Sequence, residues 1–205
     1  FQKVVEIAPS PSLPGALRER ITTAALTMAR AVDYQGLGTF EFLVDLASAD
    51  LPFVFIECNP RLQVEHTITE EVTGVDLVQA QIALAAGRRL RDIGLDPAAP
   101  PTVLGFAIQW RINAETLDAQ GNATPGSGTL RRFDLPAGPG VRVDTHGAAG
   151  ATPSPHYDTL LAKLIVHTRS PRFADALRRS QRALAECRIE GVATNLALLQ
   201  ALAAR

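Results

Sequence analysis

The sequence is poor in lysine and cysteine, and both shortages limit what the chain can be. Lysine occurs only at positions 3 and 163, while the formal net charge is −1. This balance gives no sign of a nucleic-acid partner. The two cysteines, Cys58 and Cys187, are too few for a disulfide framework and lack the spacing of a metal site. A reducing, cytoplasmic setting therefore fits the sequence best.

Long apolar runs are missing as well. No stretch approaches the roughly 18 residues that a membrane span requires, and no charged and then apolar leader opens the sequence. We therefore expect no association with a membrane. Apolar residues still make up 46% of the 205 residues, which is enough core for one large or two small domains. Because Phe1 already stands inside a predicted strand, we expect the chain to be a fragment.

A polar stretch at residues 57–66 organises the rest of the sequence. Side chains of an extended chain alternate between two faces. The odd positions would therefore form one polar row of Glu57, Asn59, Arg61, Gln63 and Glu65. At about 3.3 Å per residue this row would span roughly 26 Å. Such groups suit a metal or a planar anion, although a solvated edge strand is the alternative.

A hairpin is predicted just before this stretch, with strands at 37–47 and 52–59 around turn residues 48–50. Glu41 stands between two phenylalanines and points away from their face. Since antiparallel strands lie about 4.8 Å apart, Glu41 and Glu57 could converge on one cation. Mg²⁺ is commonly held by one or two carboxylates together with substrate phosphates. A single glutamate on a strand is more often a solvated residue, and it is the facing pair next to Asn59 that favours a metal site.

The first half of the chain also contains predicted helices. Ser12 can cap a helix that has Pro14 in its first turn and ends at Gly36. Thr67 and Glu70 have capping-box spacing and open a short helix. The apolar stripe of the first helix, expected to be core, comprises Leu17, Ile21, Ala25, Met28 and Val32. A third helix over 75–86 has an apolar face of Val78, Ile82 and Ala85.

The periodicity resets after a segment rich in proline and glycine at 94–102, where we place a domain boundary. A strand follows over 104–112, and its alternation places Gln109, Arg111 and Asn113 away from the core. Residues 121–155 predict a small antiparallel β-structure. A strand over 157–167 and helices from Ser170 to Gly191 and over 195–204 complete an α+β fold. The predicted domains are residues 1–93 and 103–205.

The polar stretch also carries a resemblance to a known family. With Thr69, Glu70 and residues 74–77, it resembles the signature of biotin carboxylase, the ATP-grasp component of biotin-dependent carboxylases. Residues 57–61 alone would also resemble carbamoyl-phosphate synthetase, but the continuation over 63–66 favours biotin carboxylase. The likeness runs from Gln2 to Asn195 and covers only the later part of the family's chain. It implies the C-terminal half of an ATP-grasp domain followed by the biotin carboxylase C-terminal domain.

The resemblance also implies an activity. ATP, with Mg²⁺ or Mn²⁺, would phosphorylate bicarbonate to carboxyphosphate, and a biotin ureido nitrogen would capture the CO₂ that this releases. It implies Glu65 as general base and Arg111 facing the biotin oxygen. The implied metal ligands are Glu41, Glu57 and Asn59, the ATP contacts are Glu41, Leu43 and Glu57, and the bicarbonate contacts are Lys3, Arg61, Gln63 and Val64.

Partners follow from the same resemblance. The expected ones are a biotin carboxyl carrier domain or protein and a carboxyltransferase domain or subunit, while a homodimer is left open. The family's dimer contact keeps its arginine here as Arg142 but has Pro139 in place of a phenylalanine. Phe1 stands where many members have a histidine near the nucleotide. The final acceptor stays open among acetyl-CoA, propionyl-CoA, longer acyl-CoA, pyruvate and urea.

Two alternatives remain beside this interpretation. The chain could be a non-catalytic remnant or interaction module with an inherited site, or it could belong to a ligase of the carbamoyl-phosphate synthetase type. The glycine-rich lid and the early ATP-grasp strands of the family are not among these 205 residues. Because the lid clamps the phosphates and excludes water, we expect the isolated chain to be inactive.

Overall fold

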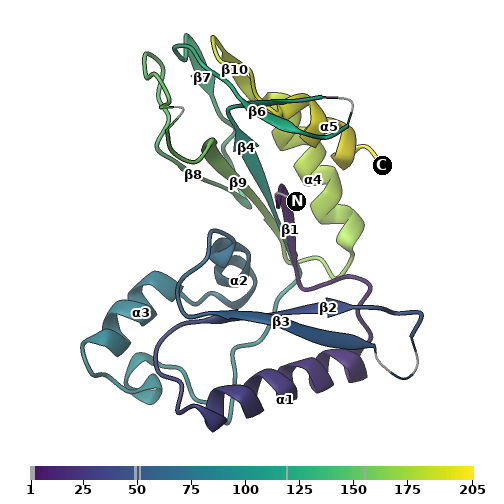
Figure 1. Ribbon diagram of the computed structural model, residues 1–205, viewed down its shortest axis with the longest axis vertical. Coiled ribbons are helices and arrows are strands. Elements are labelled where there is room, and N and C mark those ends of the chain that lie inside the picture. Colours follow the sequence, from purple (N-terminus) through teal and green to yellow (C-terminus); the bar gives the residue numbers. More distant parts are fainter. Residues whose placement is uncertain (1–2, 49, 51, 119, 155) are drawn as a thin grey trace. The chain divides into compact units, whose positions relative to one another are not determined.

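The computed structural model describes residues 3–48, 50, 52–118, 120–154 and 156–205. Phe1 and Ala49, which entered the predictions for the nucleotide contact and the hairpin turn, lie outside the described residues. The chain forms two compact units, which Figure 1 shows as ribbons. The first unit contains residues 1–9, 67–72 and 103–205, and the second contains 10–66 and 73–102. The domain limits 1–93 and 103–205 stay a prediction.

The first unit is built on a four-stranded antiparallel sheet in the order β1-β4-β9-β8. Its strands are β1 (Val5–Ala8), β4 (Phe106–Asn113), β8 (Val141–Thr145) and β9 (Leu160–Thr168). Helices α4 (Phe173–Glu186) and α5 (Leu196–Ala203) complete its main core. Buried side chains of this core include Ile108, Trp110, Ile112, Leu164, Leu184 and Leu199. The apolar alternation of the predicted strands therefore identified this core correctly.

Further apolar contacts come from helix α2 (His66–Thr73), whose residues 67–72 belong to the first unit. Ile68 and Val72 pack against Ala107 and Ile165. Because side chains on both sides of β4 are covered, Gln109 and Asn113 are fully buried. They lie on the face opposite Ile108, Trp110 and Ile112, as predicted, but that face is covered. Thr67 of α2 contacts Gln109, and Asn195 contacts Asn113.

The helix predicted to open at Thr67 begins one residue earlier. Helix α2 begins at His66, and the Thr67 hydroxyl donates to the side-chain oxygen of buried Gln109.

Two short strand pairs enclose the rest of the first unit. They are β5 (Glu115–Leu117) with β6 (Ala123–Pro125), and β7 (Arg132–Asp134) with β10 (Arg188–Glu190). Gly105 precedes β4 with a φ of 68°, and a Cβ there would lie 1.8 Å from the backbone oxygen of Thr168. Both the left-handed backbone and the lack of space therefore require glycine at this position.

The second unit contains α1 (Gly15–Ala31), β2 (Thr39–Val44), β3 (Phe53–Asn59), α3 (Leu77–Ala85) and the 3₁₀ helix η1 (Leu90–Ile93). Strands β2 and β3 form the predicted hairpin. One face of the hairpin carries phenylalanines whose rings are in contact: Phe40, Phe42, Phe53 and Phe55. The Arg20 guanidinium lies 5.5 Å from the centre of the Phe53 ring.

Details of the two long helices of this unit differ from the prediction. Helix α1 has Pro14 at its N-cap without a side-chain cap, so the predicted cap at Ser12 was wrong. Val32 lies beyond the helix end and is 69% exposed. In α3 the buried residue is Ala80, whereas Ile82 is 63% exposed. Ile82 lies about 200° round the helix from Ala80, so the predicted apolar face is turned outward.

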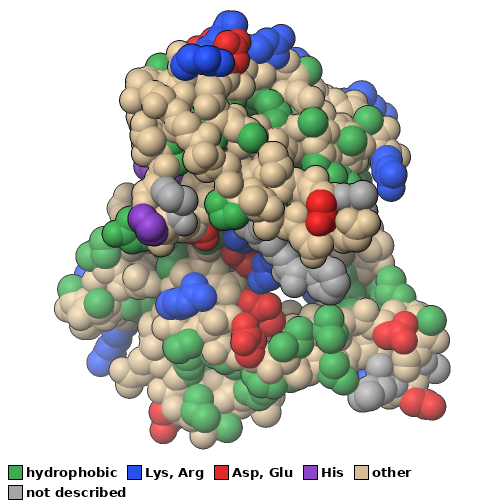
Figure 2. Space-filling view, turned by 45° about the horizontal axis from the view of Figure 1, so that its top comes forward, with side chains coloured by type: hydrophobic (Ala, Val, Ile, Leu, Met, Phe, Trp, Pro, Cys, Tyr) green, Lys and Arg blue, Asp and Glu red, His purple; other side chains and the backbone are tan. Residues whose placement is uncertain are grey.

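Several large apolar side chains of the hairpin are exposed, and Leu43 is 62% exposed. Figure 2 shows hydrophobic side chains scattered among charged ones over the visible face. All strand pairs among the described residues are antiparallel, and helices flank them, which confirms the α+β class. Within the described chain, no helix has the length and apolar character needed to cross a membrane.

Candidate functional site

Two carboxylates face each other across the hairpin of the second unit. Glu41 on β2 is the direct register partner of Glu57 on β3. The next pair is Phe42 with Phe55, so Ile56 is an extra residue in β3. A β-bulge of this kind re-aims the side chains next to it. Here it lets Glu57 share a face with Glu41 while the phenylalanines stay on the opposite face.

The side-chain amides of Asn59 and Gln63 bind this pair. Asn59 Nδ2 donates to Glu57 Oε1 at 2.8 Å and to Glu41 Oε1 at 3.2 Å. Gln63 Nε2 donates to the same Glu41 oxygen at 3.0 Å. Like charges directly opposite each other destabilise a sheet, and the two amides offset part of that repulsion. The structure therefore brings together four of the residues that the sequence singled out.

The chain turns after Asn59, so the predicted extended row of five polar residues was wrong beyond that point. Strand β3 ends at Asn59, and Pro60 has no N–H to continue a ladder. The backbone N–H of Arg61 donates to the Asn59 carbonyl at 2.8 Å, and the N–H of His66 donates to the Gln63 carbonyl at 3.3 Å. These local bonds fold residues 60–65 into a loop. Gln63 thereby returns to Glu41 instead of extending away from it.

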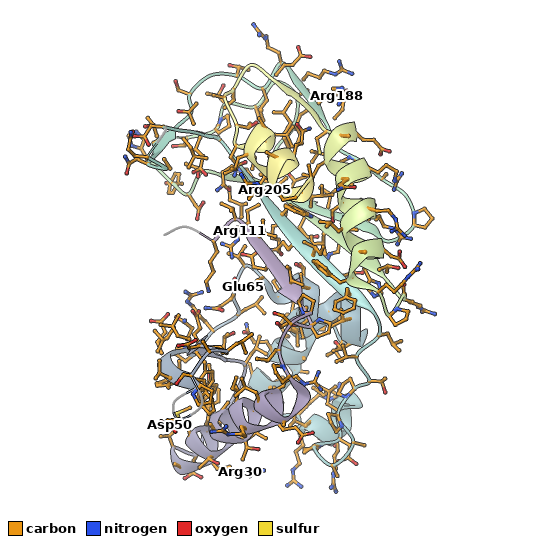
Figure 3. All side chains as sticks on the ribbon, turned by 90° about the vertical axis from the view of Figure 1, so that its right-hand side faces the viewer. Arg30, Asp50, Glu65, Arg111, Arg188 and Arg205 are labelled. Atoms are coloured by element: carbon orange, nitrogen blue, oxygen red, sulfur yellow. The ribbon has the colours of Figure 1, made fainter. Side chains whose placement is uncertain are left out.

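The other predicted residues of the second unit lie on this loop or on β2. Arg61 is exposed, and its Nη1 donates to the Leu62 carbonyl at 3.3 Å. Val64 and Glu65 are partly buried in the same loop, where Figure 3 labels Glu65. Leu43 stands two residues after Glu41 on β2 and shares its face. Their predicted roles toward bicarbonate and ATP stay predictions.

The donor set at the hairpin fits a magnesium ion. Glu41 and Glu57 supply anionic oxygens, and one amide reaches both carboxylates. Over the described part of the chain, no group of three or more His, Cys, Asp or Glu side chains could hold a metal. A site with two carboxylates suits Mg²⁺, which usually keeps waters and binds substrate phosphates in addition. The assignment of Glu41, Glu57 and Asn59 as metal ligands stays a prediction.

Lys3 and Arg111 belong to the first unit. Lys3 is exposed and precedes β1. Arg111 lies on β4 next to β1, as Figure 3 shows. Its Nη2 lies 2.5 Å from Glu6 Oε1, with the Arg111 and Glu6 side chains 13% and 9% exposed. The alternation along β4 predicted a side chain off the core, whereas the structure places it in a nearly buried ion pair.

Sequence reasoning missed the residues that surround Arg111. Glu6 lies directly opposite Gln109 in the register of β1 and β4. Gln109 Nε2 donates to Glu6 Oε2 at 2.8 Å, and Thr67 donates to the other end of the same amide. The only sequence signal was that Gln109 and Arg111 share one face of a predicted strand. Their partners come from distant parts of the chain, which local periodicity does not indicate.

A second ionic cluster lies at the other edge of the same sheet. Arg142 on β8 binds Asp144 at 2.8 Å and Glu70 of α2 at 2.8 Å, and Lys163 lies 3.2 Å from Asp144. The hydrogen bond with Asp144 raises the pKa of Arg142, although burial opposes it. Burial raises the pKa of Asp144, but Arg142 and Lys163 outweigh it and hold that pKa below its usual range. The predicted role of Arg142 in a dimer stays a prediction.

Comparisons with known proteins agree with this geometry. Residues 109–205 match the family model of the biotin carboxylase C-terminal domain, and residues 1–93 match that of the carbamoyl-phosphate synthase L chain ATP-binding domain. Pyruvate carboxylase 1 of Caenorhabditis elegans is 48% identical over 199 residues, which are 97% of this chain. The chain belongs to the biotin carboxylase family.

Solved biotin carboxylase structures have the same fold as this chain. The biotin carboxylase domain of a single-chain bacterial carboxylase is 50% identical, with a TM-score of 0.89 over the whole chain. The biotin carboxylase domain of the Hydrogenobacter thermophilus 2-oxoglutarate carboxylase is 38% identical, with a TM-score of 0.87. That structure is described as a dimer in complex with MgADP, ADP and bicarbonate.

The chain is much shorter than these relatives. It spans 16% of the C. elegans pyruvate carboxylase, 45% of the bacterial domain and 43% of the Hydrogenobacter domain. Membership of the biotin carboxylase family therefore describes the evolutionary origin and fold of these residues. What they do in catalysis is a separate question, which the side chains of the site address.

Proposed function

We propose that this chain supplies the metal-binding, bicarbonate-binding and biotin-facing side chains of a biotin carboxylase. The observation that carries the proposal is the convergence of Glu41, Glu57, Asn59 and Gln63 on one face of the β2–β3 hairpin. Two carboxylates directly opposite each other in a hairpin repel each other, and a cation between them would reduce that repulsion. A magnesium ion carrying ATP phosphates would do so.

Each side chain suits a role in this chemistry. Mg²⁺, held by Glu41, Glu57 and Asn59, would neutralise charge on the phosphates as the γ-phosphoryl group moves to bicarbonate. Arg61 has a planar guanidinium that can donate two parallel hydrogen bonds to a planar anion. Lys3, Gln63 and Val64 would complete the bicarbonate site. Leu43 shares the face of Glu41 and would contact ATP.

Two further side chains would handle protons and charge. Glu65 would remove the bicarbonate proton as general base, because it follows the anion-binding residues in the same loop. The resulting carboxyphosphate would release CO₂ and phosphate, and a biotin ureido nitrogen would attack the CO₂. Arg111 would stabilise the negative charge that develops on the ureido oxygen. The Hydrogenobacter relative, whose structure is described as a complex with MgADP and bicarbonate, supports the choice of these two ligands.

The proposal includes the partners and limits of the chain. The biotin would arrive on a carrier domain or protein, and a carboxyltransferase domain or subunit would use the product. A homodimer and a cytoplasmic location stay predictions. Because the chain spans only 45% of the bacterial biotin carboxylase domain, we propose that these residues alone do not hydrolyse ATP.

A chimera tests the proposal. The chain replaces the corresponding segment of the bacterial biotin carboxylase domain, to which it is 50% identical. We expect the chimera to carboxylate free biotin and to hydrolyse ATP in a bicarbonate-dependent manner, with its Glu65→Gln variant as the blank. A folded chimera without activity above that blank would favour the non-catalytic remnant. Bicarbonate-dependent ATP hydrolysis that yields carbamoyl phosphate from ammonia, without carboxybiotin, would favour the other ligase class.

A further inference from the structure

A chain of buried polar contacts leads away from Arg111 within the first unit. Arg111 Nη2 contacts Glu6 Oε1 at 2.5 Å, and Gln109 Nε2 donates to Glu6 Oε2 at 2.8 Å. The side-chain oxygen of Gln109 accepts from the Thr67 hydroxyl. Thr67 and Gln109 are fully buried. The contacts therefore link β4, β1 and α2 through side chains that are fully or nearly buried.

Glu6 meets a different partner at each of its carboxylate oxygens. The Gln109 amide donates a hydrogen bond to Oε2, and the Arg111 guanidinium forms an ion pair with Oε1. Thr67, in turn, fixes which end of the Gln109 amide points to Glu6. The arrangement therefore has one orientation that satisfies these contacts.

Such a contact matters most for a long, flexible side chain. A free arginine side chain samples many rotamers, and holding one of them costs conformational entropy. A group that stabilises developing charge works best when it is already in place before the reaction. Glu6 is itself nearly buried and held at its second oxygen, so it can fix the Arg111 guanidinium in advance. It also supplies the counter-charge that a buried guanidinium needs.

We propose that Glu6 is a positioning residue for Arg111, and that Gln109 and Thr67 fix Glu6 in turn. The role assigned to Arg111 rests on the proposed function, whereas the contacts themselves do not. Glu6 would not touch biotin or bicarbonate. It would act through the orientation of the guanidinium, and its loss would therefore affect the capture of CO₂ by biotin more than the cleavage of ATP.

The first test needs no enzymatic activity. In the ¹⁵N-labelled chain, the Nη–H signals of Arg111, assigned with Arg111→Lys, report rotation of its guanidinium. In Glu6→Gln one side-chain N–H would face a donor, and we expect rotation to become at least about tenfold faster, which corresponds to 1.4 kcal/mol. Glu190→Gln is the matched control, because Glu190 lies in an exposed pair with Arg132. Unchanged Arg111 signals in a folded Glu6→Gln chain would overturn the proposal.

The second test uses the chimera. We expect Glu6→Gln to lower biotin carboxylation roughly 100-fold, the loss that a misplacement of about 1 Å can cause. Bicarbonate-dependent ATP hydrolysis should change much less. Thr67→Val should act in the same direction, and Thr67→Ser, which keeps the hydroxyl donor, should restore activity.

The outcomes separate the two proposals. If Glu6→Gln lowers both activities equally, or if Thr67→Ser is as impaired as Thr67→Val, Glu6 has only a structural role and the inference fails. If the unsubstituted chimera does not carboxylate biotin, the proposed function fails. The rotation of the Arg111 guanidinium would then still decide whether Glu6 positions it.

Discussion

Asn59 binds Glu41 and Glu57 with one amide nitrogen, at 3.2 and 2.8 Å. A single neutral donor thus lies between two carboxylates that face each other in the register of the hairpin. A neutral amide offsets only part of the repulsion between two negative charges. The pair is therefore arranged to gain from a divalent cation.

Removing either charge should weaken the use of magnesium. In the chimera, Glu41→Gln and Glu57→Gln should raise the Mg²⁺ concentration for half-maximal ATP hydrolysis about tenfold or more, because a hard dication loses an anionic ligand. A Mg²⁺ titration of initial rates measures this. Glu190→Gln should leave the titration unchanged. If both site variants titrate like the unsubstituted chimera, the carboxylates do not hold the metal.

Substitution of Arg111 should lower biotin carboxylation more than it lowers bicarbonate-dependent ATP hydrolysis. Arg111→Lys keeps the charge but loses the planar fork, and we expect biotin carboxylation to fall roughly 100-fold. Bicarbonate-dependent ATP hydrolysis should stay within about threefold, since Arg111 would act after phosphoryl transfer. Parallel assays of carboxybiotin formation and of phosphate release from ATP measure this difference. Arg169→Lys, at an exposed position, is the control. An equal loss of both would place Arg111 at the phosphoryl-transfer site instead.

The ionic cluster of Arg142 should make stability depend on pH. In the folded chain the pKa of Asp144 lies below its ordinary value near 4. The contribution of Asp144 to the free energy of unfolding is therefore fully present above about pH 4, and it is lost as the pH falls through the pKa of the folded state. At pH 7, Asp144→Asn should lower the melting temperature by roughly 2–4 °C, the effect of about 1 kcal/mol. The difference from the unsubstituted chain should shrink toward pH 3.

Thermal unfolding between pH 7 and pH 3 measures this dependence. Asp134→Asn, in an exposed pair with Arg132, is the matched control and should have little effect at any pH. A difference between Asp144→Asn and the unsubstituted chain that stays constant down to pH 3 would contradict the assignment.

A methyl group at Gly105 should be costly for a reason that goes beyond backbone strain. Gly105 and Gly150 both have positive φ, but only at Gly105 would a Cβ meet a backbone oxygen, 1.8 Å away. Gly150→Ala should cost about 1–2 kcal/mol, the penalty of a left-handed backbone. Gly105→Ala should cost more, because Thr168 cannot move without disturbing β9. Chemical denaturation of both variants measures the difference, and equal losses would show that the contact relaxes.

Alternation in a hairpin is a local property, so the sequence could place Glu41. Glu57 lies opposite it only because of the bulge at Ile56, since strict alternation would put Glu57 on the face of Phe53 and Phe55. Glu41 stands between phenylalanines, and this alone placed it on the opposite face. The path of residues 60–65 was not accessible in the same way. It depends on the missing N–H of Pro60 and on two local backbone bonds, which redirect Gln63 toward Glu41.

The contacts of Arg111 show the other limit of sequence reasoning. The pattern along β4 identified its two faces correctly but assumed that one of them is solvated. That face is covered by residues 67–72, which lie far away in the sequence. Burial turned Gln109 into a link between Thr67 and Glu6. Periodicity predicts which residues share a face of a strand. What covers that face depends on tertiary contacts, which periodicity does not predict.

The first unit is assembled from three separate stretches, 1–9, 67–72 and 103–205. A protease that cuts within residues 94–102 would therefore leave two peptides that still share one sheet and one core. β1 would remain hydrogen-bonded to β4, and Ile68 and Val72 would still pack on Ala107 and Ile165. The two peptides should co-elute after such a cut, and should recombine when they are produced separately, as a split protein does.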